Sequence, residues 1–174
     1  MGLYFIAVVP HRELRLKCRN FSKDFAERFD SVKSFKNFPH ITIIKPFRFD
    51  ENQEDILVKN FSEMNLNSPP FEVFLKDFGC FPNKDNPVIF IKPKNKVELQ
   101  KLYDEVQPKM NFHSYGKLNP HLTVAYRDLS LEKFNLAWEE YQSKIFEDSF
   151  LVDKICLFKH DSKKWNLLSI KKLE

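Results

Sequence analysis

The sequence has 174 residues, of which 43% are apolar and 30% are charged, and this composition is sufficient for one domain with a substantial core. Its 28 basic and 24 acidic residues give a net charge of +4, which excludes the strongly basic surface that extended duplex binding requires. No apolar run approaches the ~18 residues of a membrane span, and the three cysteines lack any close spacing. We therefore expect a cytoplasmic protein with reduced thiols.

The first half of the chain alternates strand and helix signals. Residues 3–9 form an apolar strand that ends at Pro10, and residues 13–29 have a helical pattern. A strand containing Pro39 and His40 follows. Residues 50–64 then begin with acidic residues and predict a second helix, and the aromatic segment 71–75 predicts a third strand.

The second half repeats this order. Strands are predicted over 88–92 and 150–155, and helices over 97–106 and 130–143, with a closing strand over 165–170. A unit of strand, helix, strand, helix, strand therefore occurs twice, at a period of about 80 residues. The sequence predicts a single bilobal α+β domain over 1–174, with repeat halves of about 1–85 and 86–174. We expect mainly antiparallel sheets flanked by helices, two lobes related by a pseudo-twofold axis, and a central cleft.

The chain contains only two threonines, and each lies two residues after a histidine that follows a proline. The segments are Pro39-His40-Ile41-Thr42 and Pro120-His121-Leu122-Thr123. Because side chains alternate along a strand, each histidine shares a face with its threonine, while the apolar neighbours take the other face. The polar face must be satisfied by solvent or by a cleft, since burying it unpaired is costly.

Two such strands facing one another provide an acid and a base on either side of a phosphate. Neutral imidazole can accept a proton from a nucleophile, and imidazolium can donate one to a leaving oxygen. A metal site would need carboxylate or thiolate ligands that the motifs lack, so we predict neither a metal nor a cofactor. No G-x-S-x-G segment or glycine-rich phosphate loop is present. His11, His113 and His160 have no comparable surroundings and are interpreted as surface residues.

The paired His-x-Thr motifs on a duplicated chain resemble the 2H phosphoesterase superfamily. The closest branch is that of the bacterial 2′-5′ RNA ligase-like proteins, which act as RNA 2′,3′-cyclic phosphodiesterases. The resemblance covers nearly the whole chain, including the opening segment 3–10, the segment 38–42 and the segment 119–125. It implies a metal-independent mechanism in which His40, Thr42, His121 and Thr123 are catalytic. His121 would activate water and His40 would protonate the leaving ribose oxygen, so that the product is a 2′-phosphate.

One position departs from the pattern of RNA-acting relatives, which place arginine five residues after the second histidine. Here that residue is Tyr126, and Arg127 follows it. Arg127 is a candidate for phosphate binding, and Tyr126 for stacking on a base. Lys45 and Phe47, just beyond the first motif, are candidates for the same two roles.

The resulting hypothesis is a monomeric hydrolase of a 2′,3′-cyclic phosphate, either at an RNA 3′ end or on a small nucleotide. The sequence indicates neither a membrane nor an obligate protein partner. Three alternatives stay open at this stage: 2′-5′ RNA ligation, hydrolysis of another phosphodiester such as an ADP-ribose cyclic phosphate, and a non-catalytic module that binds RNA ends.

Overall fold

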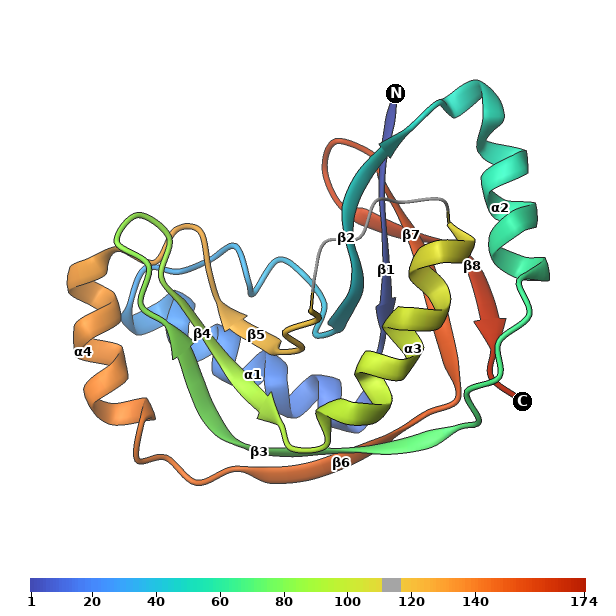
Figure 1. Cartoon of the computed structure of the whole chain (residues 1–174). Coiled ribbons are helices and arrows are strands. Elements are labelled where there is room, and N and C mark those ends of the chain that lie inside the picture. Colours follow the sequence, from blue (N-terminus) through green and yellow to red (C-terminus); the bar gives the residue numbers. More distant parts are fainter. Residues whose placement is uncertain (111–116) are drawn as a thin grey trace.

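The computed structural model describes residues 1–110 and 117–174, and its strands form one continuous antiparallel sheet (Figure 1). The strands are β1 (Gly2–Val8), β2 (Ile41–Phe49), β3 (Phe71–Phe81), β4 (Val88–Pro93), β5 (Leu122–Ala125), β6 (Glu147–Val152), β7 (Lys154–His160) and β8 (Trp165–Lys172). The helices are α1 (Arg12–Arg28), α2 (Glu54–Glu63), α3 (Lys96–Lys109) and α4 (Leu131–Tyr141), with a 3₁₀ turn η1 (Glu51–Gln53) before α2.

The sheet has the strand order β6-β3-β4-β5-β2-β1-β7-β8 and curls strongly. This confirms the α+β class and the antiparallel pairing, but the strands form one sheet, whereas the sequence predicted more than one. The third strand of each sequence half also joins strands of the other half, because β3 pairs with β4 and β7 pairs with β1. Each end of the sheet therefore contains strands from both halves of the sequence.

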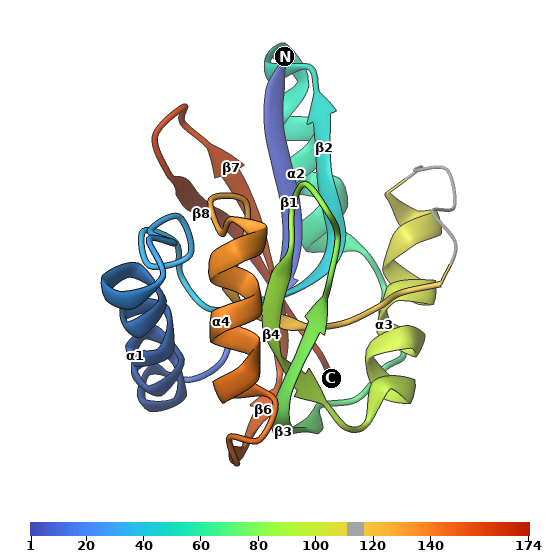
Figure 2. The same cartoon turned by 90° about the vertical axis from the view of Figure 1, so that its left-hand side faces the viewer.

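The helices pack on one face of the sheet. Helix α1 contacts β5, whereas α3 contacts β2 and α2 contacts β8. Figure 2 shows α1 and α4 side by side, with α3 on the opposite side of the molecule. The main core lies between helices and sheet and takes alternate residues of β1, namely Tyr4, Ile6 and Val8. Because of this alternation, the residues between them, Phe5 and Ala7, point to the other face of the sheet.

A small aromatic cluster occupies that other face. Phe5, Ala7, Cys156 and Phe158 are buried there, and Phe38 and Trp165 pack against them. All three cysteines are free. Burial raises the pKa of Cys18, which lies in the main core, to about 12. A buried thiol with a raised pKa is a poor nucleophile, so Cys18 is part of the packed core.

Two strand predictions need correction. The segment predicted as one strand over 150–155 changes partners at Asp153, because β6 pairs with β3 whereas β7 pairs with β1 and β8. In addition, β3 continues beyond Leu75 to Phe81. A register shift between Leu75 and Phe78 accommodates two polar residues there, and one of them, Asp77, has a φ of 55°.

Candidate functional site

The two motif strands are neighbours at the middle of the sheet. β2 and β5 meet through one antiparallel pair, Ile41 with Leu122, and both of these side chains point into the main core. Continuing the register by one residue in each direction places His40 opposite Thr123 and Thr42 opposite His121. Directly opposed residues lie ~5 Å apart, and same-face neighbours along a strand ~7 Å apart. The four motif side chains therefore form the corners of a small rectangle on the face opposite to that of Ile41 and Leu122.

His40 is held by its backbone and by two aromatic rings. Its Nδ1 is 2.8 Å from the carbonyl oxygen of Phe38. The rings of Phe5 and Phe38 each have their centroid 5.0 Å from that of the imidazole. Burial lowers the pKa of His40 to about 4, opposed by the Phe38 carbonyl and assisted by the nearby His121. The unliganded protein therefore holds His40 as a neutral imidazole at neutral pH.

His121 has matching surroundings. Its Nδ1 is 2.8 Å from the carbonyl oxygen of Asn119, and its ring packs against Phe81 and Phe90 at centroid distances of 5.1 and 5.3 Å. Burial lowers the pKa of His121, and the positive charges of Lys45 and Lys96 lower it further, whereas the Asn119 carbonyl raises it.

These contacts fix the tautomer of both histidines. A carbonyl oxygen only accepts hydrogen bonds, so each Nδ1 must carry the proton and donate it. The lone pair of the neutral ring is then on Nε2, which has no hydrogen-bond partner in either histidine among the residues that the structure describes. Each imidazole can therefore accept a proton at Nε2 and return it from the same atom.

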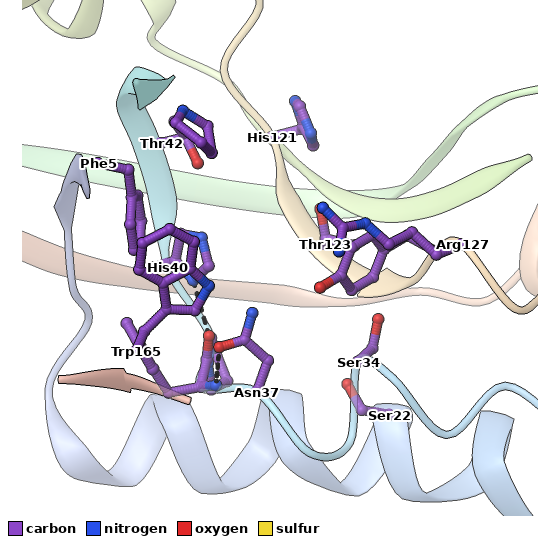
Figure 3. Close-up of a pocket in the computed structure, with 14 residues that line it drawn as sticks. Phe5, Ser22, Ser34, Asn37, His40, Thr42, His121, Thr123, Arg127 and Trp165 are labelled. Atoms are coloured by element: carbon purple, nitrogen blue, oxygen red, sulfur yellow. Dashed lines mark hydrogen bonds between the residues drawn. The ribbon is translucent and has the colours of Figure 1, made fainter. Parts of the chain in front are cut away.

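A cleft of about 190 Å³ contains all four motif residues, Tyr126 and Arg127. Figure 3 shows the two histidine–threonine pairs on neighbouring strands around one space, with Arg127 at one side. The remaining walls come from β1, α1, the loop before β2, β2 itself and the start of β8. They are formed by Phe5, Ser22, Ser34, Asn37, Phe38, Pro39, Pro46 and Trp165.

Lys45 and Phe47 do not line this cleft. Phe47 is only 8% exposed in the main core, where its ring stacks on Tyr4 at 5.9 Å. Its partner in β1 is Tyr4, whose side chain is also in the main core, so Phe47 faces the helices, away from the face of Thr42. Lys45 lies on the rim of an adjacent pocket of about 500 Å³ that shares Thr42 and His121 with the cleft.

Arg127 occupies a loop with a constrained backbone. Its φ is 68°, a left-handed conformation that is unfavourable for an arginine, and its guanidinium lies 5.2 Å from the ring centroid of Tyr126. The next residue, Asp128, accepts hydrogen bonds from the Ser31 hydroxyl at 2.9 Å and from the Val32 and Lys33 amides at 3.0 and 2.9 Å. Asp128 therefore ties the loop after β5 to the loop before β2.

The eight remaining wall residues of the cleft were not predicted as site residues from the sequence, and three of them are Ser34, Asn37 and Trp165. Ser34 and Asn37 belong to the loop that Asp128 anchors, and Trp165 begins β8. The Ser34 hydroxyl is buried without a hydrogen-bond partner among the described residues, although it lines the cleft. An unpaired buried hydroxyl is costly, so a ligand oxygen is a natural partner for it.

The other histidines lie outside the cleft where the structure describes them. His11 is exposed, and its Nδ1 accepts a hydrogen bond from the Leu14 amide at the start of α1. His160 ends β7 and accepts one from the Ser162 amide in the turn between β7 and β8. His113 lies outside the described residues.

The residues that the structure describes contain no group of three or more histidine, cysteine, aspartate or glutamate side chains arranged to hold a metal ion. None of their helices has the length and apolar character needed to cross a membrane.

Comparison with known proteins gives one consistent assignment. The sequence profile of the 2′-5′ RNA ligase superfamily matches residues 9–164. A Staphylococcus aureus (strain JH1) protein with a provisional phosphoesterase name is 22% identical over 174 residues, covering 97% of each chain. The RNA 2′,3′-cyclic phosphodiesterase of Thermotoga maritima is 24% identical over 125 residues, which cover 69% of this chain and 67% of that protein.

Among solved structures, E. coli LigT complexed with 3′-AMP superposes with a TM-score of 0.73 at 18% identity, covering 99% of this chain and 98% of LigT. Its complex with phosphate gives a TM-score of 0.63 at 16% identity, covering 99% of this chain and 97% of LigT. The chain belongs to the 2′-5′ RNA ligase superfamily of phosphoesterases and has the LigT fold.

Proposed function

We propose that the protein hydrolyses a 2′,3′-cyclic phosphodiester, at an RNA 3′ end or on a nucleotide, to a 2′-phosphate. The observation that carries the proposal is the matched pair of imidazoles in one cleft, each with Nδ1 bound to a backbone carbonyl and Nε2 available. The T. maritima relative is named for this reaction, and the E. coli relative is known in complexes with 3′-AMP and with phosphate.

In this proposal, His121 Nε2 takes a proton from a water molecule as the water oxygen attacks phosphorus. The bond from phosphorus to the ribose 3′ oxygen breaks, and the His40 imidazolium donates its Nε2 proton to that oxygen. The phosphate remains on the 2′ oxygen. The catalytic cycle closes when His121 loses the proton it gained and His40 regains one.

His40 must be protonated to act as the acid, yet its pKa in the unliganded protein is about 4. An anionic phosphate within a few ångströms favours the imidazolium and raises the pKa of the histidine that it contacts. We infer that binding of the anionic substrate raises the pKa of His40, so that His40 becomes protonated in the complex. The hydroxyls of Thr42 and Thr123 would donate hydrogen bonds to the non-bridging oxygens as negative charge builds on them.

We also propose that the two lobes are related by a pseudo-twofold axis between β2 and β5. The sheet order supports this, because outward from that pair β1 corresponds to β4, β7 to β3 and β8 to β6. The helix contacts support it too, since α1 contacts β5 while α3 contacts β2. The chain would then be one bilobal domain in which the repeat halves, about 1–85 and 86–174, exchange their third strands.

The test is turnover of a 2′,3′-cyclic mononucleotide in the presence of a chelator, with the position of the product phosphate read by ³¹P NMR. We expect a 2′-phosphate, and losses of about 10²–10⁴-fold in the His40→Ala and His121→Ala proteins. His11→Ala is the matched control, because His11 caps a helix outside the cleft. Full activity of His121→Ala, or strict inhibition by the chelator, would contradict the mechanism.

A further inference from the structure

We propose that a basic groove continuous with the cleft binds the single-stranded RNA that leads to the reacting end. This inference rests on the proposed function and narrows its substrate to an oligonucleotide. The groove has a volume of about 380 Å³, twice that of the cleft. Its basic side chains are Arg19, Lys33, Lys36, Arg127, Lys163 and Lys164.

These six cations come from four separate parts of the chain. They lie on α1, on the loop before β2, on the loop after β5 and on the β7–β8 turn. All six are exposed, and none forms an ion pair with the residues that the structure describes. Like charges that converge without partners repel one another, and a polyanion relieves that repulsion while releasing its own counterions.

The nearby carboxylates of Asp161 and Asp128 accept hydrogen bonds from other groups. Asp161 accepts hydrogen bonds from the Lys163 and Lys164 amides and from the Asn166 side chain, and so shapes the turn. Asp128 is bound to the loop before β2. No carboxylate is found among the described residues that line the groove, so its positive potential is not cancelled locally.

Aromatic side chains make the groove suitable for a single strand. Phe38, Tyr126 and Trp165 line both the cleft and the groove, so they stand where the two meet. Bases of single-stranded nucleic acids stack on such rings, while the phosphates lie along the cations. The terminal phosphate would lie between the motif threonines, with the preceding nucleotides passing these rings toward Lys163 and Lys164.

The test measures binding separately from turnover. The probe is a fluorescein-labelled hexauridylate RNA that ends in a 2′-phosphate, the product of the proposed reaction, and its binding is followed by anisotropy between 50 and 200 mM salt. The test protein carries Lys163→Glu and Lys164→Glu. A second pair, Lys33→Glu and Lys36→Glu, probes the groove from a different loop.

We expect each double variant to weaken binding at least about tenfold at 50 mM salt. The slope of log K against log salt should become shallower by about 1.4, which corresponds to two single-strand phosphate contacts. The matched control carries Lys59→Glu and Lys101→Glu, which make the same charge change at exposed positions on α2 and α3. It should bind within about twofold of the parent protein.

Equal weakening in the test and control proteins would overturn the groove, as would unchanged binding in both test variants. Equally tight binding of hexaglutamate would overturn the assignment to RNA. Mononucleotide turnover reports on the catalytic proposal alone. If the parent protein hydrolyses a cyclic mononucleotide while the groove variants bind the hexamer normally, the groove fails and the proposed function stands. If nothing is hydrolysed but the groove variants lose the hexamer, the proposed function fails instead.

Discussion

The two sides of the cleft, one built on β2 and the other on β5, share the same hydrogen bonding. In each, a histidine that follows a proline donates Nδ1–H to the carbonyl two residues earlier and lies between two phenylalanine rings. In each, a threonine stands two residues further on. The shared pattern determines that each imidazole exchanges protons through Nε2. The pKa of each imidazole then depends on the groups that surround it.

Those wider surroundings differ. Behind His40 the Phe5 ring packs on Phe158 and Trp165, at centroid distances of 5.0 and 4.4 Å, so the environment on that side is aromatic. His121 instead feels the charges of Lys45 and Lys96. A duplicated motif can therefore supply two groups of the same chemistry whose pKa values are lowered by different surroundings.

The largest expected effect tests which histidine is the acid. His40→Ala should lose about 10²–10⁴-fold in kcat/KM on a 2′,3′-cyclic nucleotide. On a nucleoside 4-nitrophenyl phosphodiester the loss should shrink to about tenfold, because nitrophenolate leaves without a proton. His121→Ala should lose the full factor on both substrates, since both need an activated water. Steady-state kinetics on the two substrates measure this.

If instead only the loss of His121→Ala shrinks on the nitrophenyl substrate, His121 is the acid and His40 is the base. Equal losses on both substrates in both variants would contradict any division of labour between the histidines.

The second effect concerns stability and follows from the lowered pKa of His40. A histidine with a pKa of about 4 in the folded protein and an ordinary value of 6.5 binds fewer protons when folded. The contribution of neutral His40 to the free energy of unfolding is fully present above pH 6.5. It is lost as the pH falls toward 4, by ~3 kcal/mol in the limit. Urea unfolding of the parent protein and of His40→Gln should therefore converge or cross as the pH falls.

Carboxylates titrate in both proteins, so their contribution cancels from that difference. Parallel stability curves from pH 7 to pH 4.5 would show that His40 is better solvated than its position implies. His121→Gln should deviate in the same direction, since the pKa of His121 is also lowered.

The third effect compares the two threonines. Thr42→Val and Thr123→Val should each lower kcat by about tenfold to a hundredfold, because a hydrogen bond to the developing charge is lost. Thr→Ser at either position retains the hydroxyl and should recover most of the rate. If both valine variants raise KM with kcat unchanged, the threonines hold the ground state and transition state equally.

The four motif residues predicted from the sequence all line the cleft, whereas two of the residues predicted around them, Lys45 and Phe47, do not. Thr42 and Thr123 lie on strands, and His40 and His121 immediately precede them in extended segments, so alternation assigns a face to all four. Phe47 lies beyond register shifts in β2 that interrupt the alternation, so the rule could not assign its face. Residues contributed by loops have no such periodicity, so the alternation rule gave no signal for Ser34 or Asn37.

The topology shows a similar division. Local signals predicted the helices and most strands to within a few residues, because caps and apolar periodicity are local features. The exchange of β3 and β7 between the ends of the sheet depends on which strands pair, and the sequence pattern of a strand does not identify its partner. That exchange brings Trp165, at the end of the β7–β8 turn, to the cleft of two strands far from it in sequence.

The smallest effect tests whether nearby lysines lower the pKa of His121 but not that of His40. Lys96→Gln removes a cation that lowers the pKa of His121, so that pKa should rise while the pKa of His40 stays where it is. Titration of the two imidazole C2 protons by NMR measures both in one sample. Lys101→Gln, on the same helix, is the control.

Salt provides an independent check of the same cause. At 1 M ionic strength the Debye length is ~3 Å, so the influence of Lys45 and Lys96 on His121 should be largely screened. His40, whose pKa is lowered mainly by burial, should respond little, because added salt leaves burial unchanged. If neither Lys96→Gln nor salt moves the pKa of His121, burial sets both histidines alike. The two sides of the cleft would then differ only in the aromatic cluster behind His40.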